Sequence, residues 1–313
     1  MNTLLYREQG LTIDSFNKKS NESVDYIGKT MKRKLLVLLF LVIIFLVKSE
    51  TTKKSKHFVL VHGSCHGGWS WYKLVSLIKS SGHRVTALDL ASSGVDPLRA
   101  SEVGSMYDYL RPLMDFMKGV GGSSKRESII MVGHSLGGLA ISKAMEEFPL
   151  MIDVAIFVTA LMPGPSLNVS TLYHQSLKSS DAQMDNHYTY DNGPNNPPTT
   201  FIFGKSFLAS KVYQRSPYED LELAIMLMRP LPLFSDEDMS KELTLSEDKY
   251  GSVDRVYIIS EKDKVMNKDV EAWMLINNQP NHVITINGSD HMVMMSKPIS
   301  LWNHLQNITN KYN

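Results

Sequence analysis

Residues 132–138 read Val-Gly-His-Ser-Leu-Gly-Gly, and this stretch decides the fold. A predicted buried strand, residues 128–132, comes before it, and a predicted helix, residues 139–145, comes after it. Glycines two residues before and after a serine permit a turn so sharp that the serine backbone is strained and its hydroxyl is exposed. The pattern predicts that Ser135 is a nucleophile; the alternative is a glycine-rich turn with an incidental serine.

The composition is that of an ordinary globular protein. The chain has 313 residues, of which 43% are hydrophobic and 21% are charged, so we expect one large domain or one domain with an insertion. A net charge of +1 argues against a nucleic-acid partner. The single cysteine, Cys65, excludes an internal disulfide framework. Neither zinc-ligand spacing nor a phosphate-binding glycine loop is present, so we expect no metal and no cofactor.

The N-terminal extension, residues 1–56, carries a short apolar segment. Thirteen apolar residues, 35–47, follow a basic cluster that begins at Met31. A bilayer span needs about 20 residues, so the segment is too short to cross a membrane comfortably. It is typical of a signal peptide, although a signal peptide should begin the chain. A role of residues 31–49 in membrane or secretory targeting therefore stays open.

The rest of the chain alternates strands and helices in two blocks, residues 57–162 and 251–313, which predicts an α/β fold with a mostly parallel sheet flanked by helices. The predicted strands are residues 58–61, 84–88, 128–132, 152–159, 255–259 and 282–286. The predicted helices are residues 69–80, 102–118, 139–145, 268–276 and 298–310. Residues 163–250 show no continuous strand signal, and we interpret them as a mostly helical lid over the carboxyl ends of the strands.

An activated serine needs a base, and the base needs a partner that fixes its tautomer. His291 follows a late strand directly, so it is the candidate base. The other histidines considered lie within a strand, on the last helix or in the lid: His282, His304, His174 and His187.

Asp263 is the candidate acid, because it follows strand 255–259 after a short turn. Three other carboxylates compete with it. Glu261 is too close to the strand to reach across easily, and Asp269 opens the next helix, where a carboxylate favours the helix dipole. Asp290 adjoins the base but should point elsewhere.

A tetrahedral oxyanion needs two N–H donors. One should be the amide of Leu136, which follows the nucleophile, and the other should come from the glycine-rich loop after the first strand. We assign the second donor to the amide of Ser64, so that the backbone and not the side chain acts. Cys65 lies close by, and we interpret it as a buried, inert thiol.

The stretches that carry these residues closely resemble the plant methylesterase family, which includes methyl salicylate and methyl jasmonate esterases and polyneuridine aldehyde esterase. The resemblance covers residues 57 to 313, and its strongest stretches are residues 57–73, 82–90, 132–138, 263–264, 288–292 and 311–313. It implies an α/β-hydrolase fold with a helical lid and the triad Ser135, Asp263 and His291. It also implies hydrolysis of small methyl esters of the plant-hormone type, by an acyl-enzyme mechanism.

Two other functions stay open. Hydroxynitrile lyases of the same family carry Thr or Asn where this chain has Gly63, and Lys where it has Met292, which argues for hydrolysis. A hormone-sensing receptor is the second alternative. The acyl group, a homodimer and pocket-lining roles for three lid residues, Phe203, Phe207 and Met226, are likewise undecided.

The compartment also stays open. The resemblance implies the cytoplasm, whereas a functional signal in residues 31–49 would imply secretion or membrane anchoring. Glycosylation sequons at Asn168, Asn287 and Asn307 would matter only in the secretory route. A glycan on Asn287 would obstruct the neighbouring His291, which favours the cytoplasm.

Overall fold

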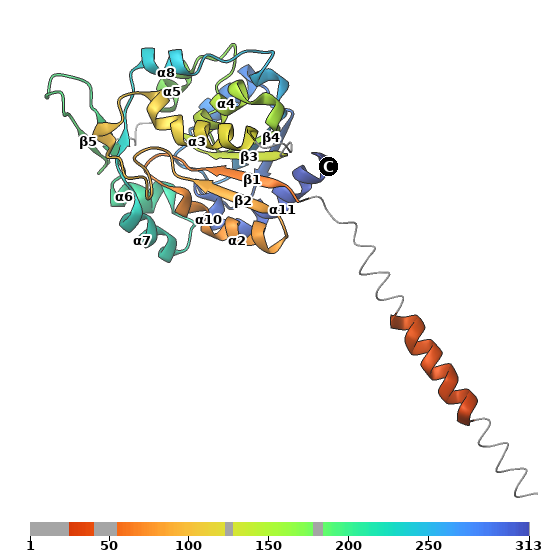
Figure 1. Cartoon of the computed structure of the whole chain (residues 1–313). Coiled ribbons are helices and arrows are strands. Elements are labelled where there is room, and N and C mark those ends of the chain that lie inside the picture. Colours follow the sequence, from red (N-terminus) through yellow and green to blue (C-terminus); the bar gives the residue numbers. More distant parts are fainter. Residues whose placement is uncertain (1–24, 41–54, 123–127, 178–183, 313) are drawn as a thin grey trace, which may run out of the picture. The chain divides into compact units, whose positions relative to one another are not determined.

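The computed structural model describes residues 25–40, 55–122, 128–177 and 184–312 (Figure 1). The chain divides into two compact units, Met1–Lys54 and Ser55–Asn313. In the first unit, residues 25–40 form an exposed helix. Within the described ranges, no helix has the length and apolar character that crossing a membrane requires. Residues 41–47 of the apolar segment lie outside the described residues, so the targeting role of residues 31–49 stays a prediction.

A six-stranded parallel sheet forms the centre of the second unit, as predicted. Its strand order is β2-β1-β3-β4-β8-β9, and every neighbouring pair is parallel. The strands are β1 (His57–Val61), β2 (Arg84–Leu88), β3 (Ile129–His134), β4 (Ile152–Val158), β8 (Arg255–Ser260) and β9 (His282–Ile286). The chain runs outward from β1 to β2 and then crosses back to β3, which places a topological switch point between β1 and β3. Ligand sites of open α/β sheets form at the carboxyl ends of strands beside such a point.

Helices cover both faces of the sheet, which explains why its inner strands are continuously apolar. In Figure 1, α3 (Met106–Gly121) and α4 (Gly137–Glu147) lie above the sheet, and α2 (Tyr72–Ser80) and α11 (Pro298–Thr309) lie below it. Successive residues of β1 alternate between two hydrophobic clusters, one packed against each helical layer. All five residues of β1 are buried.

Two predicted helices either differ from the structure by more than two residues at one end or are divided. Helix α3 begins at Met106 rather than at residue 102, because the Ser105 side chain accepts the amide of Asp108 and so caps the helix there. The predicted helix 69–80 is split into η1 (Gly68–Trp71) and α2. The remaining core helices and helical turns are η2 (Ala100–Glu102), η3 (Pro149–Met151), η5 (Tyr250–Ser252), α9 (Lys268–Asn277), α10 (Val293–Ser296) and η6 (Asn310–Tyr312).

Residues 163–250 contain a small antiparallel sheet, β5-β6-β7, that the sequence did not predict. Its strands hold only two or three residues each, too few for an alternating pattern to be recognised. The elements described in this segment are α5 (Val169–Leu177), β5 (His187–Thr189), β6 (Thr200–Ile202), α6 (Lys205–Phe207), the π-helical turn η4 (Leu208–Val212), α7 (Tyr218–Leu227), β7 (Leu231–Pro232) and α8 (Asp236–Glu242). Its role as a lid with these boundaries stays a prediction.

Candidate active site

Ser135 occupies the sharp turn between β3 and α4. Its φ of 52° lies in the left-handed region, which is strained for a residue with a side chain. The neighbouring glycines are required by close backbone contacts. A Cβ on Gly133 would lie 2.9 Å from the Gly137 carbonyl oxygen, and a Cβ on Gly137 would lie 2.5 Å from the His62 carbonyl oxygen. The strained turn expected for an exposed nucleophile is therefore present.

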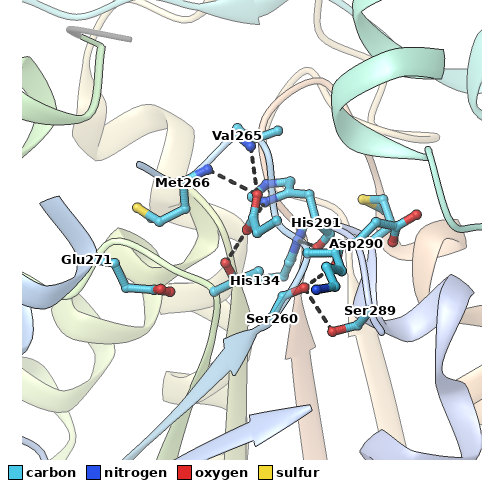
Figure 2. A network of polar contacts seen from close by, with 12 residues as sticks. His134, Ser260, Val265, Met266, Glu271, Ser289, Asp290 and His291 are labelled. Carbon is cyan, nitrogen blue, oxygen red and sulfur yellow. Dashed lines mark hydrogen bonds and ion pairs between the residues drawn. The ribbon is translucent and has the colours of Figure 1, made fainter. Parts of the chain in front are cut away.

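The loops after β8 and β9 bring Asp263 and His291 together. Oδ2 of Asp263 lies 2.8 Å from Nδ1 of His291, and both side chains are buried. The Thr159 hydroxyl donates to the same carboxylate oxygen. The amides of Val265 and Met266 donate to Oδ1 at 2.7 and 3.0 Å (Figure 2). Both oxygens of the acid are thus held in place.

The electrostatics of this pair favour an ionised acid and a defined histidine tautomer. Burial alone would raise the pKa of Asp263, but the His291 ring, the Thr159 hydroxyl and the Val265 amide outweigh burial and lower that pKa to about 2. Because the carboxylate accepts, Nδ1 of His291 carries the proton and Nε2 keeps its lone pair. Nε2 is the atom that a general base uses in this arrangement.

His291, Ser135, Ser64 and Leu136 all line one cavity. The structure therefore brings the candidate base, the candidate nucleophile and both candidate oxyanion residues to one place. No hydrogen bond joins the Ser135 hydroxyl to His291 among the described residues. Such bonds often tighten only when substrate binds.

The competing carboxylates lie elsewhere. Glu261 is exposed, accepts the Gly288 amide at 2.7 Å and pairs with Lys262 at 2.6 Å. Asp269 lies in the first turn of α9, where it faces solvent. Asp290 directs Oδ2 away from the base, toward residues 215–216.

The peptide between Gly63 and Ser64 is held in one orientation. His62 Nδ1 donates to the Gly63 carbonyl oxygen at 2.8 Å, and the His66 amide donates to the same oxygen at 3.4 Å. The Gly63 carbonyl and the Ser64 N–H belong to one planar unit, so fixing the oxygen fixes the opposite direction of the N–H. Burial lowers the pKa of His62, which keeps the ring neutral. In the described part of the chain, the Ser64 and Leu136 amides have no recorded acceptor.

The cavity has a volume of about 330 Å³, which lies within the range of small-molecule sites. Its walls are mainly aromatic and aliphatic, and they include Phe203 and Phe207. Met226 is different: its side chain is 71% exposed on α7 and is absent from the cavity lining, so its interpretation as a pocket or core residue was wrong. Nowhere in the described ranges do three or more His, Cys, Asp or Glu side chains form a group that could hold a metal ion.

Cys65 is buried near the cavity and behaves as an inert thiol. Its side chain is 2% exposed, and burial raises the pKa of the thiol to about 12. At neutral pH the reactive thiolate is therefore negligible.

Comparison with known proteins agrees with this geometry. Residues 58–302 match the model of the alpha/beta hydrolase family. The chain belongs to the alpha/beta hydrolase family. It is 50% identical to methyl jasmonate esterase 1 of Vitis vinifera over 83% of this chain and 99% of the relative.

Solved structures that are similar to this alpha/beta hydrolase include the following two. A tomato methylketone synthase I variant complexed with beta-ketoheptanoate is 51% identical, with a TM-score of 0.79 over 83% of this chain and 98% of that one. Polyneuridine aldehyde esterase is 38% identical, with a TM-score of 0.76 over 82% of this chain and 100% of that one. The resemblance to plant methylesterases is confirmed.

Gly63 and Met292 are the two positions that distinguish this alpha/beta hydrolase from hydroxynitrile lyases, and both are closely packed. A Cβ on Gly63 would lie 2.8 Å from the Cβ of Ser135, so a larger residue would push against the nucleophile. Met292 is fully buried and does not line the cavity. Neither side chain offers a polar group to a leaving cyanide.

The sequence missed several residues that orient the site. Thr159 follows β4 and holds Asp263, and a polar residue at the carboxyl end of a strand was the available signal. His134 donates from Nε2 to the His291 carbonyl oxygen at 2.8 Å (Figure 2). Burial, and then the nearby His291, lower the pKa of His134 well below its usual value. This contact has no sequence signal, because 157 residues separate the pair.

Proposed function

We propose that this alpha/beta hydrolase is a serine carboxylesterase that cleaves small methyl esters through Ser135, Asp263 and His291. The observation that carries the proposal is the contact between Asp263 and Nδ1 of His291, which places the lone pair of the neutral ring on Nε2 in a residue that lines the same cavity as Ser135. The similarity to methyl jasmonate esterase 1 and polyneuridine aldehyde esterase supports methyl esters as the substrate class.

The reaction proceeds in two halves. His291 takes the hydroxyl proton of Ser135 as Oγ of Ser135 bonds to the ester carbonyl carbon. The Ser64 and Leu136 amides stabilise the oxyanion of the tetrahedral intermediate that forms. Collapse of this intermediate breaks the bond to methoxide, which leaves as methanol with the proton from His291. Water then gives a proton to His291 as its oxygen bonds to the acyl carbon. The bond from that carbon to Oγ of Ser135 breaks, His291 returns the proton to Oγ, and the acid leaves.

The cavity favours an apolar acyl group. About 330 Å³ of mainly aromatic and aliphatic space is enough for a ringed acid of hormone size, such as a jasmonate, salicylate or indole-acetate. A test panel should contain these three methyl esters. It should also contain methyl beta-ketoheptanoate, because a relative 51% identical to this chain forms a complex with beta-ketoheptanoate.

Ser135→Ala is the deciding variant. We expect it to abolish acid release from each accepted ester, because Ser135 supplies the oxygen that forms the acyl-enzyme. Circular dichroism and thermal unfolding should match the wild type, since Ala removes only one oxygen. Retained turnover in a folded Ser135→Ala protein would refute the proposed function.

A further inference from the structure

Four consecutive residues, 213–216, contact three loops that carry candidate catalytic groups, those of Ser64, Asp263 and His291. They donate hydrogen bonds from the Tyr213 hydroxyl to His66 Nε2 (2.7 Å), from Gln214 Nε2 to the Lys262 carbonyl oxygen (2.7 Å), and from the Arg215 amide (2.8 Å) and the Ser216 hydroxyl (2.9 Å) to Asp290 Oδ2. These acceptors lie one or two residues from Ser64, Asp263 and His291. We call residues 213–216 the brace segment.

Among these acceptors, Asp290 is the one that places a carboxyl group in the protein interior. It is fully buried, and burial raises the pKa of its carboxyl group. Its other oxygen, Oδ1, is buried without a partner in the described part of the chain. A buried carboxylate with an unpaired oxygen destabilises the fold, so its presence indicates a role other than stability.

The main chain of Asp290 ties the same residue to the core. Its carbonyl oxygen accepts the Ser260 hydroxyl at 2.7 Å, and Ser260 also contacts Ser289 at 2.8 Å (Figure 2). Asp290 is therefore fixed to the end of β8 through its backbone and to the brace segment through its side chain. It lies next to His291 and does not line the cavity, so it can act only through its neighbour.

We propose that Asp290 is a positioning residue that couples the brace segment to the loop of His291, so that the hydrogen bonds from residues 215–216 hold the base in its working position. The inference rests on the proposed function, because it assigns His291 as the base. In this arrangement the segment between η4 and α7 carries no catalytic group. It sets the positions of groups that do.

A matched control exists in Asp220. It is 1% exposed, accepts the Tyr72 hydroxyl at 2.8 Å and pairs with Lys73, so it anchors the start of α7 to α2. It does not line the cavity, and in the described part of the chain the hydrogen bonds to its carboxylate come from Tyr72 and Lys73 of α2. Asp220→Ala removes a buried acid from α7, close to the brace segment, without altering the loop of the base.

The experiment compares Asp290→Ala, Asp290→Asn and Asp220→Ala on p-nitrophenyl acetate, whose acetyl group is too small to need the cavity walls. We expect Asp290→Ala to lower kcat at least about tenfold with KM changed less than about twofold, because small displacements of a base are costly. Asp290→Asn should retain kcat within about threefold, since its amide oxygen accepts both hydrogen bonds. Asp220→Ala should lower the thermal midpoint and leave kcat within about twofold of the wild type.

Three results would overturn the coupling. They are an unchanged kcat in Asp290→Ala, equal losses of kcat in Asp290→Ala and Asp220→Ala, and no recovery in Asp290→Asn. Ser135→Ala, assayed in parallel, separates the two proposals. Activity in that variant refutes the proposed function, whereas an inactive Ser135→Ala with equal Asp290 and Asp220 losses refutes only the coupling. Assays well below each measured thermal midpoint exclude unfolding as the cause.

Discussion

Oδ2 of Asp263 accepts Nδ1 of His291 at 2.8 Å, although 28 positions separate the two residues in the chain. Asp263→Asn would present an amide N–H or a weaker acceptor at this point, and the imidazole would then favour the tautomer that is useless as a base. We expect kcat to fall by about 10³–10⁴ with little change in KM, as loss of tautomer control predicts. Steady-state kinetics on the best methyl ester measure this, and a loss below about tenfold would contradict the assigned role.

The same contact makes stability depend on acid pH. The pKa of Asp263 is lowered from 3.8 to about 2, because its hydrogen bonds and the His291 charge outweigh burial. The ionised carboxylate therefore stabilises the fold above about pH 4, and this stabilisation is lost as the pH falls toward 2. The free energy of unfolding of the wild type should exceed that of Asp263→Asn by a margin that shrinks by about 2 kcal/mol between pH 5 and pH 2. Urea titrations at several pH values measure this difference in the free energy of unfolding. A difference that stays constant between pH 5 and pH 2 would contradict the lowered pKa.

Gly63→Thr tests how closely the first loop approaches the nucleophile. A Cβ at this position would lie 2.8 Å from the Cβ of Ser135 and 3.0 Å from Nδ1 of His134. We expect kcat/KM for ester hydrolysis to fall by about two orders of magnitude, because the nucleophile must shift. Thermal unfolding of the same protein shows whether the fold survives.

Gly119→Ala is the control for this substitution. A Cβ there meets nothing within 4 Å, and the residue lies inside α3. It should raise the free energy of unfolding by about 0.5–1 kcal/mol and leave kcat/KM unchanged. Wild-type activity in Gly63→Thr would show that the loop can move aside.

The sequence predicts the sheet and the placement of the candidate triad for one physical reason. A parallel sheet buried on both faces needs continuous apolar strands, and the polar residues that end such strands gather at one edge. Ser135 follows β3 directly, and Asp263 and His291 lie in the short loops after β8 and β9, so their convergence could be expected.

Contacts that depend on side-chain direction could not be predicted in the same way. Asp290 has the same relation to β9 as His291, yet its carboxylate turns to residues 215–216, about which strand patterns give no information. Met226 is apolar and lies at a helical spacing, yet it is 71% exposed. The prediction of the short strands β5, β6 and β7 fails for another reason. Pairing between residues distant in the sequence forms these strands, and no local pattern marks them.

The aromatic wall of the cavity should determine binding of the acyl group more than the chemical step. Phe207 stacks on Phe203 with ring centroids 5.4 Å apart and is 6% exposed, whereas Met226 lies on the outer surface of α7. Phe207→Leu keeps the site apolar but removes the ring, so KM for methyl salicylate should rise about three- to tenfold with kcat nearly unchanged, which is the signature of lost uniform binding. Met226→Ala should change neither constant. An equal rise of KM in Phe207→Leu and Met226→Ala would contradict a specific contact between Phe207 and the acyl group. A fall in kcat alone for Phe207→Leu would instead place the ring against the reacting atoms.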